Sequence, residues 1–284
     1  MAISDVPVLP VRTDYRSPEV ARVVPVHEHE GWDALVQHLQ DYGHVVADLS
    51  SCGEPRDALD RLTSALQLHE PYVPVMYRGR GEFDEAVTEI TRSDSGHPAI
   101  SREDGQPFHT DGFLDPIGSI RTSVLYCVAR ARSGGQTIVL DAVALFQRLL
   151  SVDAPAASTL LQPQVLERVA SLPGVSESSI GPVFAWDGAR LLNRFADGPT
   201  ERWHPAEGTS EALDRALKFF RDQAREDGEF RRSVMLEPGQ VLILENDRVS
   251  HARGSYESDP ANPRKLLRAM FPTAPHTGCP ESAR

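Results

Sequence analysis

The sequence predicts a mainly β fold with helical decoration around a β-sandwich or jelly-roll core. Short runs of β-branched and aromatic residues recur through the second half of the chain with long connections between them, while helical spacing is confined to a few segments. No GxGxxG motif follows a strand and no GxxxxGK[ST] motif occurs, so nothing indicates a parallel nucleotide-binding sheet. The 284 residues are 40% hydrophobic and 25% charged, which suffices for a large core, and we expect one domain over 1–284.

The N-terminal part is predicted to combine an arm, two helices and a polar stretch. Residues 1–25 contain four prolines and few large apolar groups, which indicates an arm laid over the domain. Apolar residues at helical spacing predict a helix from residue 32 to about Gly43 and another over 55–66, with a short strand at 44–49 between them. The following stretch, 71–120, is polar and rich in Gly, Ser and Pro, so we expect loops there, with candidate lid loops over about 71–105.

Strands dominate the rest of the chain. Their patterns predict strands over 121–129, 136–142, 183–187, 189–195, 233–246 (two runs joined at Pro238 and Gly239) and 265–271. Helical spacing predicts helices over 142–150 and 210–225. We therefore expect a helix-containing insert over about 142–227, between strands of the core.

Composition limits the compartment and the partners. The net charge of −12 disfavours nucleic acid and anionic membranes, because both attract basic surfaces. No apolar run approaches the length of a membrane span, and the first residues lack a signal-peptide pattern. The three cysteines form no CxxC motif and are predicted to be reduced thiols. We expect a cytoplasmic protein whose partner is a small molecule, and the oligomeric state stays open.

One histidine has the spacing of a metal ligand pair. Of the ten histidines, His109 alone is followed two places later by a carboxylate, that of Asp111. In an extended segment, residues i and i+2 point to the same side, so both side chains could bind one ion. His251, which follows the apolar run VLILEN and a short polar turn, is the best third ligand. Two histidines and one carboxylate suit non-haem Fe(II) with open coordination positions.

Two arginines at strand spacing follow the second histidine. Arg264 and Arg268 are four residues apart in a predicted strand, so their side chains face the same way. An arginine offers two parallel charged hydrogen bonds to a carboxylate. Either residue could therefore bind the distal carboxylate of a dicarboxylic co-substrate.

Together these motifs resemble the Fe(II)/2-oxoglutarate-dependent oxygenases of the taurine dioxygenase and clavaminate synthase-like family. Four motifs occur in the same order between about residues 107 and 272: H-T-D-G, S-G-G-Q-T, P-G-Q-V-L-I-L-E-N-D-R-V-S-H-A-R and R-K-L-L-R. The resemblance implies a double-stranded β-helix core. It also implies Fe(II) as the metal, with 2-oxoglutarate and O2 as co-substrates.

The resemblance assigns roles to particular residues. The implied iron ligands are His109, Asp111 and His251. Thr137 and Arg264 would bind 2-oxoglutarate, and Arg268 would hold an acidic group of the main substrate. The two arginines could exchange roles, and Arg253 is a third candidate for either. Independently of the resemblance, Phe108 and Phe113 flank the metal motif, and Phe113 is predicted either to line the substrate site or to pack in the core at a strand edge.

The implied reaction is hydroxylation of a small molecule with release of succinate and CO2. Asp111 stands where halogenating relatives carry a small residue, which disfavours halogenation. The same iron centre could instead catalyse desaturation, epoxidation or oxidative cyclisation. Because Arg268 offers a carboxylate clamp, an amino acid or amino-acid-derived natural product is the preferred substrate, with a sulfonate, nucleoside or sugar derivative left open. A zinc hydrolase and a non-catalytic jelly-roll binding protein are the alternatives.

Overall fold

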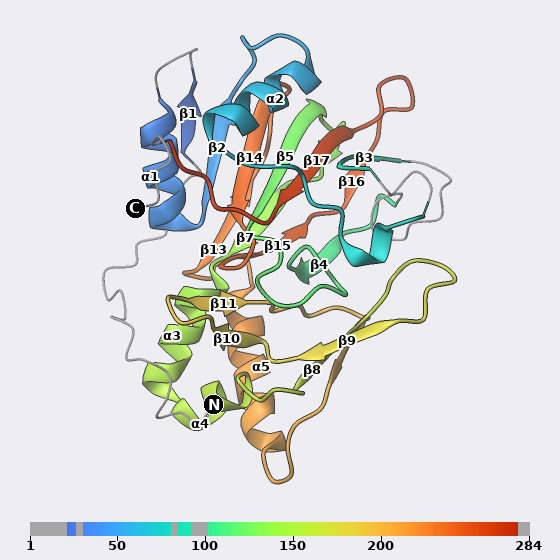
Figure 1. Cartoon of the computed structure of the whole chain (residues 1–284). Helices are drawn as coiled ribbons and strands as arrows, with labels where there is room; N and C mark the ends of the chain where they lie inside the picture. The colour runs from blue at the N-terminus through green and yellow to red at the C-terminus, as the bar shows by residue number, and fades with distance from the viewer. Residues whose placement is uncertain (1–21, 27–30, 81–84, 93–101, 278–284) are drawn as a thin grey trace.

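The computed structural model describes residues 22–26, 31–80, 85–92 and 102–277, and it is mainly β with few helices (Figure 1). The larger sheet has six strands in the spatial order β1-β2-β14-β5-β17-β3. All pairs are antiparallel except the parallel pair of β1 and β2. The strand bounds are β1 Val23–Pro25, β2 His44–Asp48, β14 Gln240–Glu245, β5 Thr122–Ala129, β17 Lys265–Phe271 and β3 Val87–Thr91.

A four-stranded antiparallel sheet carries the part of the chain that contains the metal motif. Its spatial order is β13-β7-β15-β4. The bounds are β13 Arg231–Val234, β7 Thr137–Leu140, β15 Ser250–Arg253 and β4 Gln106–His109. The smaller sheets pair β6 Ser133–Gly134 with β16 Tyr256–Glu257, β10 Phe184–Trp186 with β11 Leu191–Asn193, and β8 Leu166–Val169 with both β9 Ser178–Gly181 and β12 Glu201–Trp203.

Alternating side chains of the larger sheet supply two cores. On β5, Val124 and Tyr126 belong to the cluster that includes residues of the first two helices, whereas Leu125 and Cys127 belong to a cluster that includes Val139 of the smaller sheet. Because successive side chains of a strand point to opposite faces, one continuous apolar run serves both cores. The helices concerned are α1 Trp32–Tyr42 and α2 Pro55–Ala65.

Sequence signals explain where these helices begin and end. The α1 helix ends at Gly43, which has a φ of 73° and donates its N–H to the carbonyl of Leu39. A side chain at Gly43 would also lie 2.6 Å from a methyl carbon of Val249, so only glycine fits the turn. The α2 helix begins at Pro55, whose fixed φ and missing N–H suit the first helical position.

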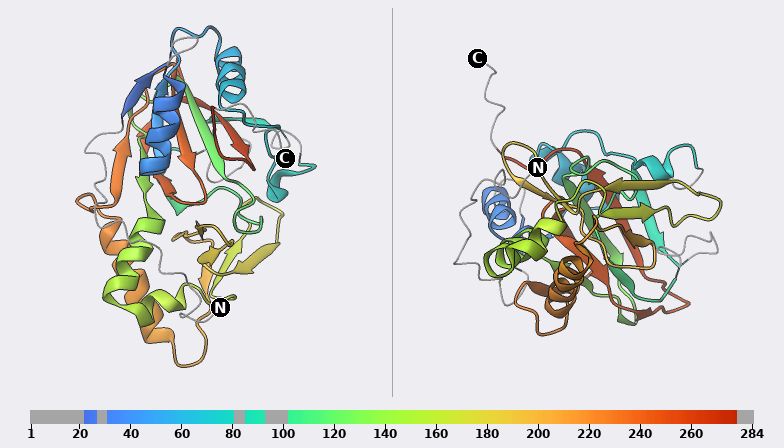
Figure 2. Two further views of the ribbon diagram at one scale, coloured as in Figure 1. Left: turned by 60° about the vertical axis from the view of Figure 1, so that its left-hand side comes forward. Right: turned by 90° about the horizontal axis from the view of Figure 1, so that it is seen from below.

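The helix-containing insert packs around its own apolar cluster. It leaves the smaller sheet after β7, returns at the neighbouring strand β13, and contains α3 Ala142–Val152, α4 Ala154–Thr159 and α5 Ser210–Gln223. Figures 1 and 2 show these helices at the end of the molecule away from α1 and α2. Phe146, Phe184 and Phe220 are fully buried there, with ring centroids 4.5–5.9 Å apart along the series. The insert therefore has a core of its own, and it also carries strands β8 to β12.

Three strands lie in segments that were predicted to lack them. β1 lies in the predicted arm and pairs with β2, and β3 lies in the predicted lid segment and pairs with β17. β4 lies in the stretch predicted as loops and ends at His109, the first residue of the metal motif. Each is short and pairs with a residue stretch far away in sequence, so local pattern carries no signal for it. The short helix α4 was also not predicted. Residues 1–21, 81–84, 93–101 and 278–284, which include parts of the predicted arm and lid, lie outside the described residues.

The described helices are short. None of them combines the length and the apolar character that crossing a bilayer requires.

A buried histidine predicts acid sensitivity of the fold. His44 begins β2 and is 2% exposed, and its Nδ1 donates to the carbonyl of Tyr42 at 3.1 Å. Burial lowers the pKa of His44 from 6.5 to about 4. Between pH 4 and pH 6.5 the unfolded chain therefore binds more protons than the folded chain does. The free energy of unfolding is unaffected by His44 above pH 6.5 and falls as the pH drops toward 4, by about 3 kcal/mol in total.

We therefore expect His44→Gln to lose less unfolding free energy than the wild type between pH 7 and pH 4.5. Urea denaturation at both pH values measures the difference. Equal losses in the two proteins would contradict the prediction.

Candidate metal and 2-oxoglutarate site

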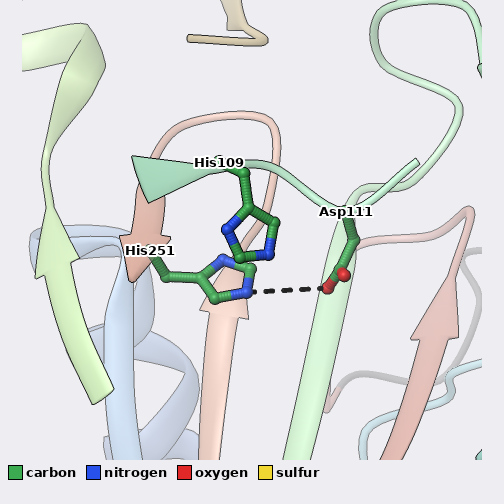
Figure 3. A group of neighbouring side chains, drawn as sticks. All are labelled: His109, Asp111 and His251. Carbon is green, nitrogen blue, oxygen red and sulfur yellow. Dashed lines mark ion pairs between the residues drawn. The ribbon is translucent and has the colours of Figure 1, made fainter. Parts of the chain in front are cut away.

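Pairing of two strands brings the three predicted ligands together. His109 ends β4 and lies opposite His251 of β15 in the antiparallel register, with ring centroids 4.3 Å apart. Asp111 follows two residues after β4, and its Oδ2 lies 4.0 Å from Nε2 of His251 (Figure 3). All three side chains are buried, and one ligand atom of each lies within 4.8 Å of the others.

Hydrogen bonds set the orientation of the His109 ring. Nδ1 lies 2.9 Å from the carbonyl oxygen of Pro107, which requires that Nδ1 carries the proton. Nε2 is therefore the unprotonated nitrogen, whose electron pair here accepts a hydrogen bond from the side-chain amide of Gln106 at 3.1 Å and would instead bind a metal ion when one is present. Metal-binding histidines characteristically donate their second ring nitrogen in this way.

The loop that carries Asp111 is held from several sides. Oδ2 accepts a hydrogen bond from the Ser123 hydroxyl at 2.7 Å, and Oδ1 accepts one from Nη1 of Arg268 at 3.1 Å. The Asp111 backbone N–H donates to Oδ1 of Asn246 at 2.8 Å, and the Asn246 amide donates to the Asp111 and Ile120 carbonyls. These contacts fix the carboxylate and its peptide unit together.

Electrostatics keep the donor set in its metal-binding protonation state. Burial lowers the pKa of both His109 and His251, so their imidazoles are neutral at pH 7. Burial by itself raises the pKa of Asp111, but Arg268 and the two histidines outweigh it and hold the pKa below its usual value. Two neutral imidazoles and one carboxylate form the facial donor set that suits Fe(II). The residues therefore fit the implied metal.

Arg264 supplies a buried cation on one side of the metal ligands. It is 4% exposed, it lines the same cavity as His109 and Thr137, and its Nη2 donates to the Gly135 carbonyl at 3.4 Å. Among the described residues, its Nη1 has no hydrogen-bond partner. A buried guanidinium N–H without a partner is costly, so this geometry is suited to an anionic ligand.

Arg268 supplies a second buried cation, in contact with the metal ligands. It lies two residues beyond Leu266 on β17, so its side chain faces the same side as that of Arg264. Nη1 contacts Asp111, and within the described part of the chain Nε and Nη2 have no hydrogen-bond partner. Tyr77 lies beside it, with its ring centroid 5.5 Å from the guanidinium carbon.

Arg253, the third candidate arginine, is engaged by backbone. Its Nη2 donates to the carbonyls of Arg102 and Asp104, at 2.9 and 2.6 Å. Its guanidinium carbon lies 5.2 Å from the Tyr256 ring, and that of Arg264 lies 5.1 Å from the same ring. Arg253 therefore lines the metal cavity while its guanidinium tethers the segment before β4 to β15.

Two adjoining cavities meet at the metal ligands. A cavity of about 50 Å³ is lined by the three ligands, Thr137, Arg264 and Arg268, and one of about 250 Å³ is lined by Pro107, Thr200 and Glu201. Gln106, His109, Phe113 and Ser171 line both. The Phe113 ring centroid lies 5.9 Å from that of His109, and Phe113 lines both cavities.

Sequence reasoning missed the residues that hold the ligands in place. Gln106, Ser123, Asn246 and Arg168 all contact the HxD segment or its ligands; Gln106 lies on β4 itself, whereas the other three come from other elements of the chain. Asn246 belongs to the motif that ends at His251 and Arg253, but the motif assigned it no role. Nothing in the local pattern around Arg168 indicates a contact with residue 110, because the contact joins the insert to β4.

The donor set and the mainly β fold define a class of protein, the non-haem iron, 2-oxoglutarate-dependent dioxygenases, and this chain is one of them. The chain belongs to the taurine catabolism dioxygenase TauD, TfdA family, whose model matches residues 12–270.

Two relatives align over most of the chain. A uridine-5'-phosphate dioxygenase from Amycolatopsis sp is 37% identical over 269 residues, covering 93% of this chain and 98% of the relative. A second uridine-5'-phosphate dioxygenase, from Streptomyces sp, is 39% identical over 250 residues, covering 86% of this chain and 90% of the relative.

Solved structures share the fold. An asparagine oxygenase in complex with Fe(II), hydroxyasparagine and succinate has a TM-score of 0.63 at 16% identity, covering 84% of this chain and 77% of that one. The non-haem iron oxygenase OrfP with Fe and alpha-ketoglutaric acid has a TM-score of 0.60 at 17% identity, covering 84% and 79%. PvcB from Pseudomonas aeruginosa has a TM-score of 0.62 at 14% identity, covering 94% and 93%.

Proposed function

We propose that this dioxygenase acts on a nucleoside 5'-monophosphate of the uridine 5'-phosphate type. The observation that carries the proposal is the second buried guanidinium, that of Arg268, which lines the metal cavity and whose Nε and Nη2 have no hydrogen-bond partner among the described residues. A phosphate is an anion that an arginine fork binds strongly. The two relatives that align over most of the chain are named for uridine 5'-phosphate, and this supports the nucleotide.

In this proposal His109, Asp111 and His251 hold Fe(II). The bound ion supplies the activation of O2, with conversion of 2-oxoglutarate to succinate and CO2, that oxidises the substrate. The protein contributes a fixed donor set: the proton on Nδ1 of His109 stays with the Pro107 carbonyl, and Ser123 and Arg268 hold the two oxygens of Asp111. Buried surroundings exclude water from this face.

The two arginines divide the anions between them. Arg264, with Thr137 of the other sheet lining the same cavity, binds the distal carboxylate of 2-oxoglutarate. Arg268 binds the phosphate of the substrate. Phe113 lines the boundary between the two cavities, and the larger cavity of about 250 Å³ receives the nucleoside. Arg253 supports the wall through its backbone contacts instead of binding either anion.

An amino acid is the second candidate substrate. The planar fork of Arg268 that suits a phosphate also suits an α-carboxylate, and it lies equally close to the metal ligands in that case. Hydroxylation, desaturation, epoxidation and oxidative cyclisation differ in where the substrate's C–H bonds lie, so the mass of the product distinguishes them.

Succinate formation with defined substrates tests the assignment. With Fe(II), 2-oxoglutarate and O2, we expect uridine 5'-phosphate to raise succinate formation well above the rate without substrate, and uridine to raise it much less. Asparagine and arginine are the comparison substrates. We expect Arg268→Gln to lose roughly 30-fold or more in kcat/KM for the nucleotide, because a buried charge pair is lost. Stimulation by an amino acid but not by the nucleotide would overturn the proposal.

We also propose that the two larger sheets form a double-stranded β-helix within a single domain. Shared apolar residues between the sheets support this, as does the return of the insert to the strand beside the one it left.

A further inference from the structure

Arg168 is a buried cation that lies outside the predicted site. It belongs to β8 of the insert and is 1% exposed. Nη1 donates to the Thr110 hydroxyl at 3.0 Å, and Nη2 donates to the Thr110 carbonyl at 2.6 Å. Its guanidinium carbon lies 4.2 Å from the centroid of the Phe113 ring. One side chain of the insert thus contacts the residue between the two metal ligands of the HxD segment and the aromatic residue that follows.

These contacts act on the geometry of the ligand pair. Thr110 is the only residue between His109 and Asp111, so rotation of its peptide units changes the direction of both ligands. Nη1 and Nη2 of Arg168 hold the side chain and the carbonyl of Thr110 in place. Asn246, the residue that follows β14, accepts a hydrogen bond from the Asp111 N–H. The segment is therefore clamped from two elements that are distant in sequence.

Charge pairing alone does not account for the position of Arg168. Among the described residues, Arg168 forms an ion pair with Glu201, whose Oε1 lies 3.9 Å from Nε, and Nε has no hydrogen-bond partner there. The oxygens of Glu201 accept hydrogen bonds from the Gly198 N–H and the Thr200 hydroxyl instead. The guanidinium makes its short hydrogen bonds to Thr110, within the HxD segment.

We propose that Arg168 is a positioning residue that clamps Thr110 and so holds His109 and Asp111 in the arrangement that binds the metal. This inference rests on the proposed function, in which those residues bind Fe(II). The clamp and the charge of Arg168 have opposite effects on metal affinity. A cation near a divalent metal ion opposes metal binding, so loss of the charge alone would raise the affinity for the metal. Loss of the clamp would lower it.

Metal affinity of the purified protein tests the clamp. We expect Arg168→Gln to weaken Fe(II) binding roughly 10- to 100-fold, the range known for residues that orient metal ligands. We expect Arg168→Lys to be weakened as well, because it keeps the charge but lacks the planar fork. Anaerobic titration against a competing chelator gives the affinity, and the visible spectrum of the Co(II)-loaded protein reports a change in ligand geometry.

Arg194 provides the matched control. It is buried, at 4% exposure, in the same insert, and it donates to the Ser179 carbonyl. We expect Arg194→Lys to leave the Fe(II) affinity and the Co(II) spectrum unchanged. Thr110→Val tests the clamp from its other end without changing a charge. Both changes remove the hydrogen bond between Nη1 of Arg168 and the Thr110 hydroxyl. The double variant Thr110→Val with Arg168→Lys should therefore lose less Fe(II) affinity than the product of the two single losses.

Each outcome decides between explanations. If Arg168→Gln binds Fe(II) as tightly as the wild type or more tightly, the clamp is wrong. If Thr110→Val and Arg168→Lys lose affinity independently, Arg168 does not act through Thr110, and the clamp is also wrong. If the wild-type protein itself binds no Fe(II), the proposed function fails before the clamp is tested.

Discussion

We expect Asp111→Asn to lose at least ~100-fold in Fe(II) affinity and all 2-oxoglutarate turnover, because even residues that merely orient metal ligands contribute roughly 10- to 100-fold. Asparagine has the shape of aspartate but a single oxygen, which can still accept from Arg268, while the amide nitrogen faces the Ser123 hydroxyl, which can accept from it. What changes is the negative charge that offsets the metal. Anaerobic titration measures affinity, and succinate formation measures turnover.

Asp115 offers a control four residues further along. Its carboxylate is also buried, and it accepts hydrogen bonds from the Tyr72 hydroxyl at 2.7 Å and the Val75 N–H at 3.2 Å. It is not part of the cluster of potential ligands found among the described residues. We expect Asp115→Asn to bind Fe(II) as the wild type does. Equal losses in both variants, or wild-type affinity in Asp111→Asn, would remove Asp111 from the ligand set.

The second large effect is expected at Arg264. Arg264→Gln should weaken 2-oxoglutarate binding by about 2–5 kcal/mol, or roughly 30- to 5000-fold, if its guanidinium and the distal carboxylate form a buried charge pair. The basis is its burial, its place beside Thr137 in the metal cavity, and an Nη1 that has no partner among the described residues. Isothermal titration of the Fe(II)-loaded protein under anaerobic conditions gives the affinity.

Arg253→Gln is the matched comparison for this measurement. Arg253 stacks on the same Tyr256 ring, but its Nη2 donates to two backbone carbonyls. We therefore expect a smaller loss of 2-oxoglutarate affinity in Arg253→Gln than in Arg264→Gln. A larger loss at Arg253 would assign the binding of the distal carboxylate to that residue, and a larger loss at Arg268 would mean that Arg264 and Arg268 exchange roles.

Local pattern predicted those parts of the fold in which one segment carries its own signal. The helix that ends at Gly43 and the helix that begins at Pro55 were predicted within a residue or two, as was β5 with its unbroken apolar run. β1 and β3 were missed because three- to five-residue edge strands gain their stability from a partner strand. β4 was predicted as loop, although the i, i+2 spacing of its metal motif already assumed an extended backbone.

The sequence by itself determined the chemistry: an HxD pair, a distant histidine and two arginines at strand spacing predicted an iron site with a dicarboxylic co-substrate, because donor types and periodicity are local properties of the chain, and the resemblance of the motifs implied that this co-substrate is 2-oxoglutarate. Only the tertiary structure decided how these groups are held in place. It placed Arg253 against backbone carbonyls, left nitrogens of Arg264 and Arg268 without a hydrogen-bond partner among the described residues, and brought Arg168 of the insert onto Thr110. Such contacts join residues tens to more than a hundred positions apart, and their specificity comes from burial and hydrogen-bond geometry, which exist only once the chain has packed.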